Sequence, residues 1–199
     1  AIDHATPAAF YAHVKERNEQ YTIGKQLVES ANDFYAGSDF TIPTDPEYPN
    51  GNTLYEEANY NGFTIARGYA DYQDKAANAK KMILLQSEEA SKADRYSIPY
   101  ALDRKAGDLT LTDITRAGID FMMKKQGEKN GFFMMIEGSQ LDDYGHFNQL
   151  DMLMKETLDF DRTIGRVMQW AANDGETLVV VTADHQTGGL TVLGGDVNT

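Results

Sequence analysis

The sequence contains no cysteine in its 199 residues, so disulfide bonds and thiolate metal sites are excluded. Any metal ion must therefore be bound by oxygen and imidazole ligands. Basic residues are scarce: 18 Lys and Arg against 31 Asp and Glu give a net charge of −13. This balance argues against a nucleic-acid partner, because a nucleic-acid binder needs a basic face. No apolar run approaches the roughly 20 residues that a membrane-spanning helix needs, so no membrane span is expected.

Apolar residues make up 41% of the chain and charged residues 25%, which is ordinary for a globular protein. Strand and helix patterns alternate along the chain and predict an α/β fold, a mostly parallel sheet flanked by helices. We expect one domain over residues 1–199, with an irregular excursion at about 86–110. The expected strands are residues 33–37, 63–66, 82–85, 131–136 and 177–182. The expected helices are residues 7–17, 22–31, 52–60, 72–79, 112–125 and 147–172.

Two of these strands, Gly131–Ile136 and Thr177–Thr182, are continuous apolar runs, as expected of strands buried on both faces. A long helix with apolar positions at a period of 3.6 residues connects them and stops at Gly175. Strand, helix and strand form a βαβ unit, so the two strands should be parallel.

Polar side chains follow both of these strands. Glu137, Asp142 and His146 come after the first, and Asp184 and His185 come after the second. Because ligands bind at the carboxyl ends of parallel strands, these groups are expected to converge on one edge of the sheet. Carboxylates with neutral imidazoles are the ligand set of catalytic zinc. Each group alone is equally typical of a helix cap or a solvated strand end, so only their combination favours a metal site.

The segment Glu137–His146 resembles the Glu-Gly-x-x-Ile-Asp-x-x-x-His signature of the alkaline phosphatase family. Residues Val181–His185 resemble the second metal-binding strand end of that family. The segment His4–His13, followed by Arg17, resembles its Asp/His-Ala-Thr-Pro-Ala segment and the arginine after it. The three segments occur in the family order, which makes the resemblance specific.

The resemblance implies a fold and a set of site residues. Asp142 and His146 would bind one zinc ion, and Asp184 and His185 a second. Thr6 and Glu137 would hold magnesium, with His4 in or next to its outer shell. Arg17 would bind two oxygens of a phosphate monoester. In the family a serine is phosphorylated first and that intermediate is then hydrolysed.

The family nucleophile, a serine in an Asp-Ser-Ala segment, has no counterpart here, because no Asp-Ser pair occurs in the chain. The third histidine of the first zinc site is also missing. We therefore expect the chain to be the central portion of a phosphatase, to bind zinc weakly, and not to turn over alone. Two alternatives remain: a phosphodiesterase or sulfatase of the same superfamily, and a non-catalytic metal- or phosphate-binding module.

Several further expectations concern single residues and the context of the protein. His13 is expected to be structural, Asp39 and Asp143 to be solvated, and most methionines to lie in the core. Asp143 stands where the family often carries lysine, histidine or tryptophan, so it should weaken phosphate attraction. An unpaired sheet edge makes a homo-oligomer plausible. The resemblance also implies export, to the periplasm or the extracellular space.

Overall fold

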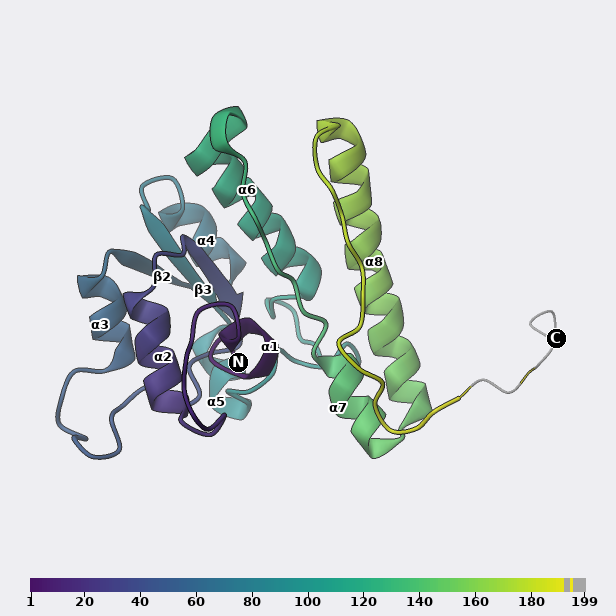
Figure 1. Cartoon of the computed structure of the whole chain (residues 1–199), viewed down its shortest axis with the longest axis horizontal. Coiled ribbons are helices and arrows are strands. Elements are labelled where there is room, and N and C mark those ends of the chain that lie inside the picture. The colour runs from purple at the N-terminus through teal and green to yellow at the C-terminus, as the bar shows by residue number, and fades with distance from the viewer. Residues whose placement is uncertain (192–193, 195–199) are drawn as a thin grey trace. The chain divides into compact units, whose positions relative to one another are not determined.

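The computed structural model describes residues 1–191 and 194, except for the side chains of residues 5 and 126–129. These residues form two compact units, 1–137 and 138–199 (Figure 1). The first unit contains α1 (Ala5–Ala8), α2 (Gln20–Glu29), β1 (Phe34–Gly37), α3 (Leu54–Tyr60), β2 (Phe63–Arg67), α4 (Gly68–Lys75), β3 (Lys81–Leu85), α5 (Glu88–Ala93) and α6 (Leu111–Asn130). The second contains α7 (Gln140–Phe147) and α8 (Leu150–Asp174).

The first unit is built on a parallel three-stranded sheet in the order β1-β3-β2. The central strand β3 is the most apolar, and its residues Met82, Ile83, Leu84 and Leu85 are fully buried. A strand covered on both faces reads as such a continuous apolar run, and the prediction of a parallel sheet is confirmed.

Side chains of alternate strand residues pack into two separate cores. On one face, Tyr35, Phe63 and Ile83 pack against residues of α2 and α3. On the other face, Met82 and Leu84 pack against residues of α4 and α6. The unit is therefore a three-layer αβα arrangement, which the ribbon shows directly (Figure 1). This confirms the α/β class.

Two helices begin at capping boxes. At α3, Thr53 accepts a hydrogen bond from the Glu56 amide and the Glu56 side chain accepts one from the Thr53 amide. Thr110 and Asp113 do the same at α6, so the helix begins at Leu111, one residue before the start predicted from the sequence. The reciprocal bonds satisfy two amides that would otherwise lack partners.

The expected helix over residues 7–17 does not form; α1 ends at Ala8. The Tyr11 hydroxyl donates to the Ile2 carbonyl at 2.7 Å, and this bond turns the segment back on itself. Farther on, the amide and carbonyl of His13 bond to the Gln26 side chain at 2.6 and 3.2 Å. Because its backbone groups already have partners, His13 gains nothing from a helical hydrogen bond.

The two strands predicted at 131–136 and 177–182 are not paired as strands. Instead of being buried, Phe133 is 77% exposed and Leu178 is 86% exposed. A strand needs a neighbour to satisfy its amides and carbonyls. In the first unit the strands pair only among β1, β3 and β2, and the elements described in the second unit are helices.

Helix α8 ends at Gly175, whose φ of 78° is the left-handed conformation expected of a glycine stop. The apolar positions on this helix were predicted to be core, but Leu150, Met154, Leu158 and Met168 are exposed. The described residues of the second unit form no sheet on which these side chains could pack. Among the described residues, no helix is both long enough and apolar enough to cross a membrane.

Candidate metal centre

Asp142 and His146 lie one turn apart on α7, a short helix that the sequence pattern did not reveal as an element of its own. Their spacing of four residues places them on the same side, as predicted. The His146 Nε2 atom lies 3.3 Å from the Asp142 Oδ2 atom. Both side chains are partly open to solvent.

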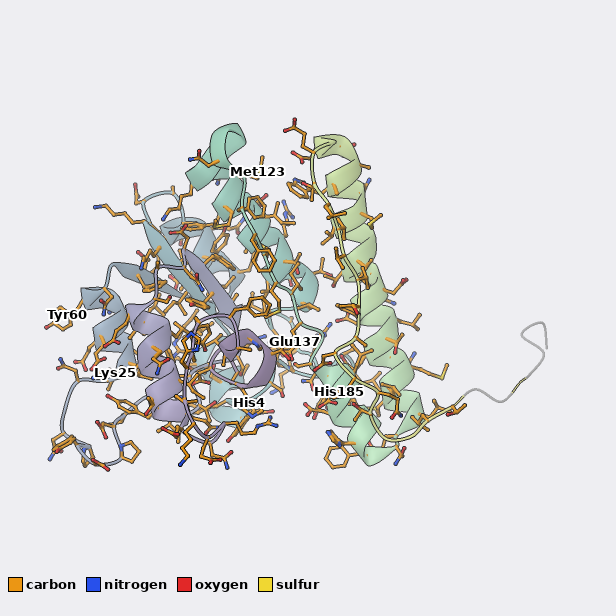
Figure 2. The ribbon with its side chains drawn as sticks, in the orientation of Figure 1. His4, Lys25, Tyr60, Met123, Glu137 and His185 are labelled. Carbon is orange, nitrogen blue, oxygen red and sulfur yellow. The ribbon has the colours of Figure 1, made fainter. Side chains whose placement is uncertain are left out.

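Asp184 and His185 form a second pair on the loop that follows residues 177–183 (Figure 2). The His185 Nε2 atom lies 3.3 Å from the Asp184 Oδ2 atom. Two ligand atoms bound tetrahedrally to one zinc ion, each at about 2.0–2.1 Å, lie about 3.3 Å apart. In each Asp–His pair, the nitrogen and the oxygen are therefore as far apart as two ligand atoms of one tetrahedral zinc ion.

Thr187 joins the two pairs and was not identified from the sequence. Its hydroxyl donates to Asp142 Oδ1 at 2.5 Å, and the hydroxyl oxygen lies 3.1 Å from His185 Nδ1. His185 Nδ1 and Asp142 Oδ1 are themselves 4.0 Å apart. Four predicted zinc ligands are thus linked through one threonine.

Two glycines allow this close approach. A Cβ at Gly188 would lie 2.0 Å from the Gly145 carbonyl oxygen, and one at Gly145 would lie 3.0 Å from Thr187 Cβ. Any larger residue would push the loop away from α7. The Gly188-Gly189 pair, which begins three residues after His185, is the sequence signal that could have drawn attention to this loop.

The pairs fit zinc by donor chemistry and spacing, but each supplies only two protein ligands. Among the residues that the structure describes, no group of three or more His, Asp or Glu side chains is arranged to hold a metal ion.

The residues predicted to bind magnesium and phosphate all lie in the first unit. His4 packs edge to face against Tyr96, with ring centroids 5.5 Å apart. Thr6 lies within α1, and Glu137 is the last residue of the unit. Arg17 lies in the irregular segment before α2 and is exposed. Their assignment to magnesium and phosphate stays a prediction.

Asp39 was predicted to be solvated, and that prediction is wrong: the residue is 1% exposed at the carboxyl end of β1. Its carboxylate accepts hydrogen bonds from Tyr55 at 2.6 Å and from both terminal nitrogens of Arg67 at 3.2 Å. Arg95 lies 3.5 Å away and also donates to the Tyr55 hydroxyl at 3.1 Å. Burial, together with the bond to Asp39, raises the pKa of Tyr55 above its usual value. Open parallel sheets bind ligands at the carboxyl ends of their strands. Here ion pairs of Asp39 with Arg67 and Arg95 lie at that end of β1.

Three comparisons relate the chain to known proteins. The family model described as alkaline phosphatase matches residues 32–199. The chain is 31% identical to alkaline phosphatase 4 of Bacillus subtilis over 194 residues, covering 96% of this chain and 39% of that protein. It is 29% identical to the repressible alkaline phosphatase of Saccharomyces cerevisiae, covering 95% of this chain and 37% of that protein.

Among solved structures, alkaline phosphatase from the Antarctic bacterium TAB5 matches with a TM-score of 0.80 and 35% identity, over 95% of this chain and 52% of that one. A mutant of the TAB5 enzyme with Mg bound in its M3 site matches with a TM-score of 0.79 and 33% identity, over 95% of this chain and 51% of that one. The chain thus spans well under two thirds of the length of these relatives.

Proposed function

Since the chain belongs to the alkaline phosphatase family, we propose that the whole protein hydrolyses phosphate monoesters with the help of two zinc ions and one magnesium ion. The observation that carries this proposal is the two Asp–His pairs, which Thr187 connects. In each pair the histidine nitrogen lies 3.3 Å from the aspartate oxygen. The mutant of TAB5 alkaline phosphatase with Mg bound in its M3 site supports magnesium as a further metal of the whole protein.

We assign the zinc ligands as two pairs. Asp142 and His146 hold the first ion through one carboxylate oxygen and Nε2, the two atoms that face each other on α7. Asp184 and His185 hold the second ion in the same way. When bound, two such zinc ions would stabilise the attacking and leaving oxygens of an in-line displacement.

The remaining assignments concern residues of the first unit. Thr6 and Glu137 hold magnesium, with His4 in or next to its outer shell. Arg17 binds two phosphate oxygens, for which its planar guanidinium is suited and a lysine ammonium is not. Its exposed position in an irregular segment leaves it able to reach such a ligand.

The 199-residue chain on its own should not turn over. No serine in it follows an aspartate, so the family's nucleophile segment has no counterpart among these residues. Each zinc ion also finds only two protein ligands here, which predicts weak binding. Hydrolysis of p-nitrophenyl phosphate by the isolated chain, abolished by Asp184→Ala, would contradict this.

The test of the whole-protein function is a substrate profile of the full-length protein that contains these residues. We expect hydrolysis of p-nitrophenyl phosphate, loss of that activity in Asp184→Asn, and little hydrolysis of the phosphodiester or sulfate ester of p-nitrophenol. A preference for either of those esters would replace the proposal with the corresponding superfamily activity. Metal binding without turnover of any ester would favour a binding module.

Three further proposals concern context. We propose that both units belong to one α/β domain, for which the match to TAB5 alkaline phosphatase over 95% of the chain is the support. We propose self-association of the chain through its exposed apolar segments. The family resemblance supports a periplasmic or extracellular location, and the net charge of −13 disfavours a nucleic-acid partner.

A further inference from the structure

We propose that Asn50 is a site of spontaneous deamidation, through which a surface loop of the first unit gains a carboxylate. The chain contains the dipeptide Asn-Gly at Asn50-Gly51, Asn61-Gly62 and Asn130-Gly131. The third pair adjoins residues 126–129, whose side chains are not described, so the comparison is between the first two. The reaction needs only water and no metal ion, so the proposal is independent of the proposed function.

The reaction proceeds through a succinimide ring. The backbone nitrogen of Gly51 attacks Cγ of Asn50, the bond from Cγ to Nδ2 breaks, and ammonia leaves with the amide proton of Gly51. Water then adds to one of the two ring carbonyls. Opening at Cγ gives aspartate, and opening at the backbone carbonyl gives isoaspartate, whose chain runs through Cβ. No oxidation or reduction occurs, and the new carboxyl group is ionised at neutral pH.

The structure leaves Asn50 able to reach the geometry of ring closure. Asn50 and Gly51 are exposed and lie in the loop between β1 and α3, outside any helix or strand. The Asn50 side chain has no hydrogen-bond partner among the described residues. One backbone bond, 2.9 Å from the Gly51 amide to the Tyr48 carbonyl, closes the turn. An exposed turn of this kind opens at little cost in free energy, and Gly51 has no Cβ to hinder the attack of its nitrogen.

Asn61-Gly62 has the same chemistry but is held by its surroundings. Asn61 ends α3, and its backbone amide and its Nδ2 atom both donate to the Glu57 carbonyl, at 3.0 and 2.9 Å. The Gly62 amide donates to the Asn59 carbonyl at 3.1 Å. The next residue, Phe63, is buried at the start of β2. Ring closure at Asn61 must break the side-chain bond and disturb the junction of a helix with a buried strand, so it is slower there.

Hydrogen bonds on the far side of Asn50 confine the change to the loop. The Leu54 amide donates to the Pro43 carbonyl at 2.8 Å, which ties the end of the loop to its beginning. The capping box of Thr53 and Glu56 then starts α3. The deamidated chain therefore keeps its fold, and its net charge becomes one unit more negative than −13.

The test is incubation of the folded chain at mildly alkaline pH, followed by proteolytic digestion and mass spectrometry of the peptides. The peptide that contains Asn50 should gain one mass unit about tenfold faster than the peptide that contains Asn61, because Asn61 must first break its additional bonds. Electron-transfer fragmentation should show both isoaspartate and aspartate at position 50. Equal rates at the two asparagines, a faster reaction at Asn61, or aspartate alone at position 50 would overturn the proposal.

Two controls separate the effect of the structure from that of the local sequence. In concentrated urea, where neither pair is held, Asn50 and Asn61 should react at similar rates. A difference that persists in urea would show that neighbouring residues select the site, and would refute the structural argument. Gly51→Ala should slow the reaction at Asn50, because its Cβ hinders the attacking nitrogen, and should leave the rate at Asn61 unchanged. An unchanged rate at Asn50 in this variant would contradict ring closure.

Discussion

At the scale of single residues, Asp39 is a buried carboxylate of the first unit with two charged partners. Its carboxylate lies between Arg67 and Arg95, and removing its charge would leave two guanidinium groups without their common partner. Breaking a buried ion pair from one side is strongly destabilising, whereas breaking an exposed pair is nearly neutral.

Asp39→Asn is therefore expected to lower the free energy of unfolding by about 3 kcal/mol. The matched control is Glu88→Gln, which breaks the exposed pair between Glu88 and Lys92 and should change stability by less than about 0.5 kcal/mol. Urea unfolding of both variants measures the difference. Equal stability of the two variants would mean that the network at the sheet edge contributes little.

Tyr72 gives a prediction for alkaline pH. Its hydroxyl donates to the Ala117 carbonyl at 2.7 Å, and burial raises its pKa from about 10 to about 12. A raised pKa means that the folded state holds the proton more tightly than the unfolded state. The stabilisation is fully present below pH 10 and is lost as the pH rises toward 12.

Tyr72→Phe should remove this pH dependence. Thermal melts between pH 9 and about pH 12 should show a smaller fall in stability for the variant than for the unsubstituted chain. Because the variant also lacks the hydrogen bond to Ala117, it should be the less stable of the two at neutral pH. Parallel stability curves for the two proteins over this range would contradict the assignment.

Residue spacing was sufficient to predict the Asp142–His146 pair, because side chains four apart on any helix share a face. It was not sufficient for Thr187 or for Asp39. Thr187 contacts Asp142 across 45 positions of the sequence and Asp39 contacts Tyr55 across 16, and no local pattern encodes either contact. Asp39 follows a strand just as a solvated loop residue does, and only the arginines that the fold brings to it distinguish the two cases.

At the scale of elements, the packing of the loop at residues 184–189 against α7 determines how the metal ligands meet. Gly188 and Gly189 both adopt a positive φ, 77° and 70°, so a side chain at either causes the same backbone strain. They differ in space: a Cβ at Gly188 would collide with the Gly145 carbonyl, whereas one at Gly189 would have no atom within 4 Å.

Gly188→Ala should thus weaken zinc binding clearly more than Gly189→Ala does. Chelator competition on the two variants measures this, and hydrogen exchange of the α7 amides shows whether the loop has moved away. The comparison cancels the strain that both substitutions share. A weaker affinity in the Gly189 variant would indicate that backbone strain, not the close approach, controls the site.

The sequence pattern predicts burial of the apolar face of α8 and of the segments 131–136 and 177–182. In the structure, apolar side chains of all three stay exposed. The helix itself was predicted because its periodicity and its glycine stop are local properties. Pairing of the two segments was predicted wrongly, because a strand depends on its neighbours as much as on its own apolar residues.

Exposed apolar side chains of this kind favour association between chains. Sedimentation equilibrium of the isolated chain should show the average mass rising with concentration. Replacing Leu178 and Val180 by threonine should reduce this association, because both side chains are mostly exposed and their removal costs the core nothing. A monomer at every concentration would refute self-association through these segments.

At the scale of the whole molecule, the fold class could be predicted because the strands and helices of the first unit alternate in sequence. Each strand there also carries its own turn signals and apolar run. The division into two compact units could not be predicted, because it depends on which segments find partners. The predicted metal ligands follow the same rule. Each Asp–His pair is local in sequence, whereas the contact between the two pairs depends on tertiary structure.

The central claim is that Asp142, His146, Asp184 and His185 hold two zinc ions. The most direct test is a zinc titration of the chain followed by the imidazole resonances of its four histidines. We predict that His146 and His185 shift together as zinc is added, while His13, whose side chain is exposed in another unit, stays unchanged. Equal shifts at His13, or no shift at His146 and His185, would contradict the assignment.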